Sequence, residues 1–120
     1  MSSSETGVSS LSSLTKTQLD TLKIHQMIVR NEINMEAALK LRKSSGISRG
    51  SHYRVLSQAK NNVLESLFTV ATAVQIGILR ADDVQKLLAT VSLIPEDADP
   101  EKLAEVMVLV RTIAARIVMS

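Results

Sequence analysis

The chain contains no cysteine and no tryptophan, and only one tyrosine and one phenylalanine occur among its 120 residues. The absence of cysteine excludes disulfides, thiolate chemistry and cysteine-ligated zinc sites. Four glycines, two prolines and 45% hydrophobic residues favour helices over strands, with a core of aliphatic side chains. The length suits one small domain. We therefore expect an all-α protein that is one compact domain overall.

Acidic residues are missing from the middle of the chain. Residues 37–64 contain six lysines and arginines but no aspartate or glutamate, whereas the remainder holds eight basic and twelve acidic residues. This uneven distribution is typical of a contact surface for a polyanion. A solvated charged face is the alternative reading of the same pattern.

Targeting and membrane signals are also missing. The N-terminus lacks the charged and apolar regions of a secretory signal, and no uncharged apolar run is long enough to span a bilayer. We expect a cytoplasmic, nucleoid-associated protein. Seven serines lie between residues 2 and 13, and this composition predicts a disordered tail over residues 1–13.

Helix-start signals divide the rest of the chain. Residues that favour the position just before a helix are Thr15, Asn34, Ser48, Asp82 and Asp99. They predict helices over residues 16–31, 35–43, 49–76, a segment after residue 82, and 100–119. Gly46 and Gly77 are placed where helices end.

The expected long helix changes character along its length. Up to Asn62 it is polar and basic, and from Val63 onward it is amphipathic, with apolar residues on one side. We therefore expect a helix-turn-helix unit over residues 14–62, followed by a hydrophobic helical oligomerisation region over residues 63–120.

The short second helix, the turn and the basic helix have the layout of a helix-turn-helix. The stretch GISRGSHYRVL, residues 46–56, resembles the turn and recognition-helix start of resolvase and invertase-type DNA-binding domains. Gly46 matches the turn glycine, Ile47 the apolar residue beneath the helix pair, and Ser48 the helix cap, while Tyr53 and Arg54 match a common Tyr-Arg pair. The resemblance implies DNA binding and brings no catalytic domain with it.

The sequence departs from the family pattern at three positions, because Arg42, Ser45 and His52 stand where small or apolar residues are usual. Two interpretations remain open. Either the turn is longer than usual and Ala37 or Ala38 makes the close helix contact, or the short match is a coincidence.

A recognition helix enters the major groove by its first residues, while neighbouring basic side chains hold phosphates. Arg54 is a candidate for a bidentate contact to guanine. The expected DNA-binding residues are Lys40, Arg42, Lys43, Ser48, Arg49, Ser51, His52, Tyr53, Arg54 and Lys60.

The last expected helix contains a short heptad seam. Apolar residues spaced three and four apart are Leu103, Val106, Val110, Ile113 and Ile117. Such spacing predicts a dimer interface and hence a homodimer or a higher oligomer. An internal core helix is the alternative.

No group of residues indicates catalysis. The sequence shows no carboxylate cluster, no glycine-rich phosphate loop and no nucleophile beside His25 or His52. We expect no enzyme activity, metal, cofactor or small-molecule ligand. The prediction is a sequence-specific double-stranded DNA-binding protein, either a small homodimeric transcriptional regulator or a plasmid or virus maintenance factor. The alternatives are a small helical subunit that binds RNA or single-stranded DNA, and a protein–protein interaction module.

Overall fold

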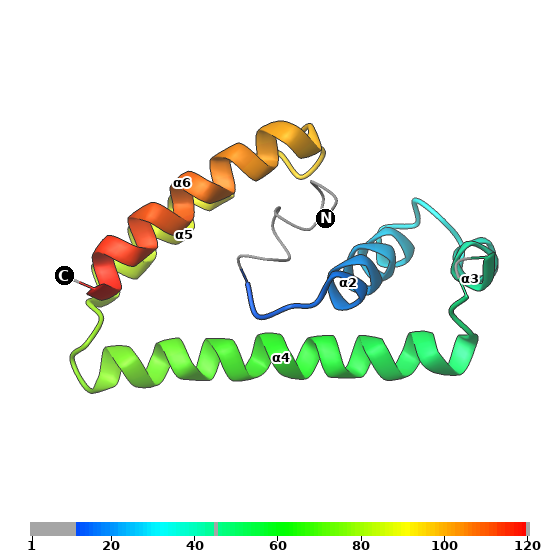
Figure 1. The fold of residues 1–120 in the computed structure, drawn as a ribbon, viewed down its shortest axis with the longest axis horizontal. Coiled ribbons are helices and arrows are strands. Elements are labelled where there is room, and N and C mark those ends of the chain that lie inside the picture. The colour runs from blue at the N-terminus through cyan, green and yellow to red at the C-terminus, as the bar shows by residue number, and fades with distance from the viewer. Residues whose placement is uncertain (1–11, 45, 120) are drawn as a thin grey trace. The chain divides into compact units, whose positions relative to one another are not determined.

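The computed structural model describes residues 12–44 and 46–119. Within these residues the fold is all-α, as predicted, with five helices and no strand. The helices are α2 (Lys16–Val29), α3 (Met35–Ser44), α4 (Arg49–Gln75), α5 (Ala81–Ser92) and α6 (Pro100–Met119). Figure 1 shows α4 as one unbroken helix, and its 27 residues correspond to a length of about 40 Å.

Helices α2, α3 and α4 begin with the side-chain caps that the sequence predicts. Thr15 and Gln18 form a capping box, in which each side chain accepts the other residue's backbone N–H at 3.1 Å. Asn34 Oδ1 and Ser48 Oγ each accept the backbone N–H three residues further on, at 2.7 and 3.2 Å. These bonds satisfy N–H groups that a helix start leaves without a partner, so they set where α2, α3 and α4 begin.

The same three helices each end with a residue in the left-handed backbone conformation. Asn31, Gly46 and Gly77 follow α2, α3 and α4 with positive φ angles of 59°, 83° and 88°. After α3, the Ile47 N–H donates back to the Arg42 carbonyl at 2.8 Å, which is the long bond of a Schellman motif. Glycine and asparagine tolerate this left-handed conformation better than other residues, so they define the helix ends.

The start of α5 differs from the prediction. Asp82 is not its cap, because Arg80 occupies that position with φ −90° and ψ 134° and makes no side-chain cap bond. The Arg80 carbonyl already accepts the Val84 N–H at 3.2 Å, so Asp82 lies within the first turn. At α6 the prediction is confirmed, since Asp99 Oδ1 accepts the Glu101 N–H at 3.1 Å.

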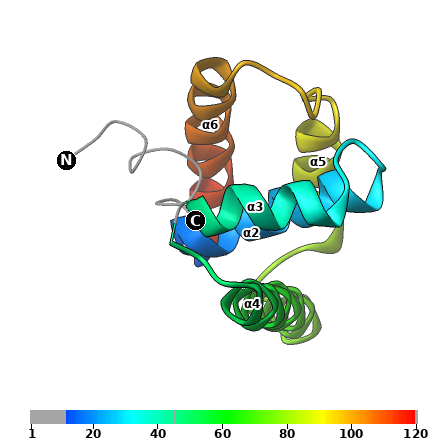
Figure 2. The ribbon, with the colours of Figure 1, turned by 90° about the vertical axis from the view of Figure 1, so that its right-hand side faces the viewer.

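The chain divides within α4 into two compact units. We call Ser12–Glu65 the N-terminal unit and the residues from Ser66 onward the C-terminal unit. In the N-terminal unit α2 packs beside α3 (Figure 2). Its buried residues include Ala38 of α3, together with Leu56 and Ala59 of α4. Ala38 is one of the two alanines that the longer-turn interpretation requires at the helix contact.

Most of the predicted tail, residues 1–11, lies outside the described residues. Its last residue is held in place, contrary to a tail that extends to Ser13. The Ser13 hydroxyl donates to Asn62 Oδ1 at 2.8 Å, and Asn62 Nδ2 donates to the Ser13 carbonyl at 2.9 Å and to Gln18 Oε1 at 3.1 Å. Asn62 therefore attaches the segment before α2 to the middle of α4.

The C-terminal unit buries much less. Its helices α5 and α6 pack on each other, and Val110 of α6 is the only buried side chain among the unit's described residues. No helix within the described ranges combines the length and apolar character needed to cross a bilayer.

Candidate nucleic-acid interface

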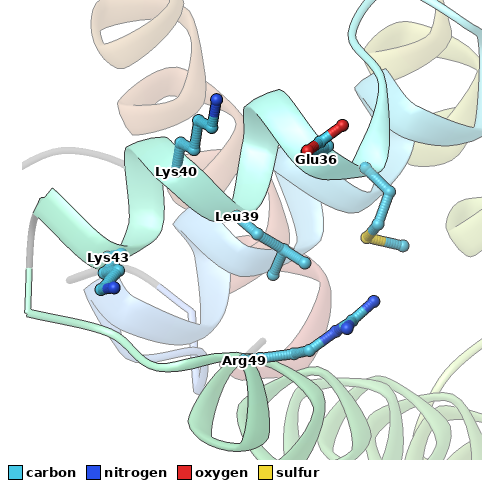
Figure 3. A pocket seen from close by; sticks show the side chains of 6 residues that line it. Glu36, Leu39, Lys40, Lys43 and Arg49 are labelled. Atoms are coloured by element: carbon cyan, nitrogen blue, oxygen red, sulfur yellow. The ribbon is translucent and has the colours of Figure 1, made fainter.

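Three of the predicted DNA-binding residues surround one hollow of the N-terminal unit. The hollow has a volume of about 510 Å³ and is lined by Met35, Glu36, Leu39, Lys40, Lys43 and Arg49. In Figure 3, Leu39 points from α3 toward the start of α4, where Arg49 extends beneath it. Lys40 and Glu36 lie on the side of α3 away from α4. Three cations and one carboxylate give the hollow a net positive charge, so it suits an anion.

Two predicted contact residues, Ser48 and Ser51, are used to start α4. The Ser48 hydroxyl accepts the Ser51 N–H at 3.2 Å and donates to the Ser51 hydroxyl at 3.0 Å. This cap fixes Arg49 as the first residue of α4 and brings it next to the end of α3. The two serines therefore fix the position of Arg49 at the start of α4.

Tyr53 lies beside the hollow. Its hydroxyl donates to Sδ of Met35 at 3.6 Å, a weak bond that joins α4 to α3. The ring meets His52 edge-on, with 5.5 Å between the ring centroids. The side chain is 44% exposed, so it remains accessible to a ligand of the hollow.

Arg54 and Lys60 lie on different faces of α4, and both are exposed. Successive residues of an α-helix are turned by about 100°. Tyr53 and Lys60 therefore share the face of Arg49, whereas Arg54 points about 140° away from it. Lys40, Lys43 and Arg49 therefore line the hollow, Lys60 lies three turns further along the Arg49 face of α4, and Arg54 lies on another face.

Arg42 does not lie on the surface where the sequence analysis placed it. Its side chain is 5% exposed, and Nη2 donates a hydrogen bond to the hydroxyl of Thr21 on α2, while its Nε has no partner among the described residues. The reason is helical periodicity, because Arg42 follows the fully covered Ala38 by four residues and so shares the inner face of α3. In this position Arg42 joins α3 to α2 and cannot reach a phosphate.

His52 is also inside the N-terminal unit, with 1% of its surface exposed. It shares the inner face of α4 with Leu56 and Ala59, four and seven residues further on. Burial lowers the pKa of His52 below its usual 6.5, and the nearby charges of Arg42 and His25 lower it further. Neither ring nitrogen has a hydrogen-bond partner among the described residues. His52 is therefore a neutral packing residue at neutral pH.

The sequence reasoning missed Met35, Glu36 and Leu39, which complete the hollow. It also placed Arg42 and His52 outside, although a signal for their burial was present. His52, Leu56 and Ala59 have the i, i+4, i+7 spacing of a buried stripe. His52 was assigned to the surface because it is polar, although this spacing indicates that it is buried.

The predicted dimer seam of α6 lies mainly on the side that the chain itself covers. Val110 is buried, and three neighbours on the same face are half-buried: Leu103, Val106 and Ile117. Ile113, at 43% exposed, is the most accessible member of the seam. The packing of α5 on α6 thus uses part of the surface that the heptad spacing assigned to a second copy.

No family model matches the chain, and no match was found among curated proteins or solved structures.

Proposed function

We propose that the N-terminal unit is a helix-turn-helix module that binds double-stranded DNA with sequence preference. The chain then acts as a homodimer, either as a small transcriptional regulator or as a plasmid or virus maintenance factor, associated with the nucleoid in the cytoplasm. One observation carries the proposal. The cations Lys40, Lys43 and Arg49 line one hollow beside the end of α3 and the start of α4, and residues 37–64 contain no acidic residue.

The local structure supports this proposal. Gly46 ends α3 and Ser48 caps α4, so four residues (45–48) connect the two helices. A short turn holds the first residues of α4 in a defined place, as a helix that reads a groove requires. Backbone N–H groups and the positive end of the helix dipole favour phosphate at the same place.

The burial of Arg42 and His52 narrows the expected contact set. We retain Lys40, Lys43, Arg49, Tyr53 and Lys60 as expected contacts, and Arg54 as a separate candidate on another face of α4. Lysine and arginine hold phosphates, and Tyr53 can contact a sugar or a base.

The first test is salt dependence on duplex DNA. With about four to five phosphates neutralised per chain, the logarithm of affinity falls with the logarithm of salt concentration at a slope near −0.9 per contact. The probe is a site selected from random duplexes, compared with its single strand and with RNA of the same sequence. Equal affinity for all three would favour the alternative of a helical subunit that binds RNA or single-stranded DNA.

The second test removes one cation of the hollow. Arg49→Ala should weaken binding to specific and non-specific duplexes alike and reduce the salt slope by about one unit. Arg111→Ala is the matched control, because Arg111 is an exposed arginine of α6. If both variants bind as the unchanged chain does, the hollow is not a DNA contact.

A third test concerns Arg54, which was predicted to read guanine. Arg54→Ala should cost about 1–3 kcal/mol on the selected site and relax the preference at one position. A uniform loss across all sequences would make Arg54 a phosphate contact instead.

A further inference from the structure

Polar side chains make up half of the core of the N-terminal unit. The residues buried where the structure describes this unit are Ala38, Leu56, Ala59, Thr21, Arg42 and His52. The last three are polar or charged, and two of the three apolar residues are alanines. His52 is the largest of the fully covered side chains. The aliphatic part of this core is therefore small, and its stability depends on how the polar members are accommodated.

The three buried polar residues come from three different helices. Nη2 of Arg42, on α3, donates to the hydroxyl of Thr21 on α2, and that hydroxyl donates to the Thr17 carbonyl at 2.7 Å. The Arg42 Nε and both ring nitrogens of His52, on α4, have no hydrogen-bond partner among the residues that the structure describes. Because buried polar groups are usually paired, an added charge at this place would be costly.

The groups that act on His52 supply only positive charge. Burial is the largest cause that lowers its pKa, followed by Arg42 of α3 and the half-buried His25 of α2. Tyr53, the next residue of α4, meets the His52 ring edge-on. No carboxylate in the described part of the chain contributes to this pKa. A proton on His52 would therefore place a second cation beside Arg42, covered from solvent and without a counter-charge.

We propose that His52 and Arg42 form an acid-sensitive switch, in which protonation of His52 opens the packing of α2, α3 and the first half of α4. The sign follows from proton binding. Between 6.5 and the lower folded-state pKa of His52, the open form binds more protons than the closed form. The equilibrium constant for opening therefore rises by up to about tenfold for each pH unit of acidification in this interval. The inference concerns the folding of the unit, so it does not depend on the proposed function.

The C-terminal unit provides a control within the same chain. Both histidines of the sequence, His25 and His52, belong to the N-terminal unit, and residues 66–120 contain none. Aspartate and glutamate ordinarily titrate near about pH 4, well below histidine. In the interval between these ranges, acidification should therefore act on the N-terminal unit and leave the packing of α5 on α6 unchanged.

The first experiment follows opening helix by helix. Native-state amide hydrogen exchange is measured by NMR from about pH 7.5 to about pH 5 and corrected for the intrinsic exchange rate at each pH. Protected amides of α2 and α3 should lose protection by up to about tenfold per pH unit, whereas those of α5 and α6 should keep theirs. Equal losses in both units, or constant protection in α2 and α3 while His52 titrates, would overturn the proposal.

Two substitutions assign the loss of protection to one histidine. His52→Gln removes the titrating group and should make the protection of α2 and α3 independent of pH in this interval. His25→Gln is the matched control and should retain most of the dependence, because burial and Arg42 lower the pKa of His52 more than His25 does. The proposal is wrong if His25→Gln abolishes the dependence and His52→Gln preserves it.

The role of Arg42 is measured by the NMR titration of the His52 ring. The midpoint should lie below 6.5 in the unchanged chain. Arg42→Met should raise it part of the way towards 6.5, since burial remains, and Arg42→Lys should keep it low because the positive charge is retained. An unmoved midpoint in Arg42→Met removes Arg42 from the switch. The unchanged chain is decisive even if a variant does not fold, because a midpoint at or above 6.5 overturns the whole proposal.

Discussion

The two units contain equally regular helices but bury very different amounts of side chain. In the N-terminal unit the buried residues come from all three helices: Thr21, Ala38, Arg42, His52, Leu56 and Ala59. In the C-terminal unit Val110 is the only one among the described residues. The presence of regular helices therefore does not indicate how large the buried core of a unit is. Local signals form helices in both units, whereas a core needs surfaces that meet.

The exposed apolar residues repeat this difference. Within the described residues of the C-terminal unit, Phe68, Leu93 and Met119 are each more than 70% exposed, and no large apolar residue of the N-terminal unit reaches that level. An isolated exposed apolar side chain is ordinary, but a line of them along one helix marks an interaction surface. The N-terminal unit therefore has the more complete core, and the C-terminal unit has the most exposed of the apolar side chains that the structure describes.

The largest expected difference between the two units is in how much a Leu→Ala substitution lowers the free energy of unfolding. Leu56→Ala, at a buried position of the N-terminal unit, should lower the free energy of unfolding by about 2–5 kcal/mol. Leu109→Ala, at a position of α6 that is 63% exposed, should change it by about 0.5 kcal/mol or less. Urea denaturation followed by circular dichroism measures both changes, because both units are helical. Equal effects of the two substitutions would mean that the units do not differ in burial.

A smaller difference is expected from the helix caps. Asn34→Ala removes the cap of α3 and should cost about 0.5–2 kcal/mol. Arg80→Asn gives α5 a cap that it lacks, and a gain of the same size is expected. Thermal unfolding followed by circular dichroism measures both changes. No gain from Arg80→Asn would show that α5 is limited by packing and not by its start.

Glycine substitutions should give effects of about 0.5–1 kcal/mol with opposite signs. Gly46→Ala is unfavourable because φ at this position is 83°, although nothing lies within 4 Å of the added methyl group. Gly50→Ala, in the first turn of α4 with equally open space, should be stabilising, since alanine favours a helix. Gly77→Ala, with φ of 88°, should repeat the loss in the C-terminal unit. Urea titrations of the three variants test these signs.

The smallest expected change in the free energy of unfolding near neutral pH comes from the titration of His52. Its pKa is lowered in the folded chain from 6.5, so below this pH the unfolded chain binds more protons than the folded one. The free energy of unfolding should therefore fall as the pH decreases from 6.5 through the folded-state pKa. His52→Phe should remove this part of the slope, whereas His25→Gln should retain most of it, because burial is the larger cause of the lowered pKa of His52. An unchanged slope in His52→Phe would assign the acid sensitivity to other groups.

The helices and most of their ends could be predicted because these depend on neighbouring residues. The capping box of Thr15 and Gln18, the cap by Asn34 and the left-handed Gly46 all act within one or two turns of chain. Asp82 was assigned wrongly as the cap of α5, because a cap residue must also have an extended backbone, and there Arg80 has it.

The candidate site could be predicted only in part. Lys40, Lys43 and Arg49 were expected at the contact surface, and they line one hollow. Arg42 and His52 were assigned to the same surface by their residue type, but they face the neighbouring helices. Met35 and Leu39 were not expected there, because apolar residues of α3 contribute to a surface hollow only once α4 is packed against it.

The sequence by itself determined that this protein is helical, where most helices begin and end, and that residues 37–64 carry only positive charge. Those properties arise from backbone geometry and composition, which need no distant partner. Tertiary structure alone decided which cations are accessible, that Arg42 donates to Thr21, and which residues of α4 are buried. The reason is that the orientation of a helix about its axis is chosen by the surfaces it packs against, and those surfaces come from residues far away in the chain.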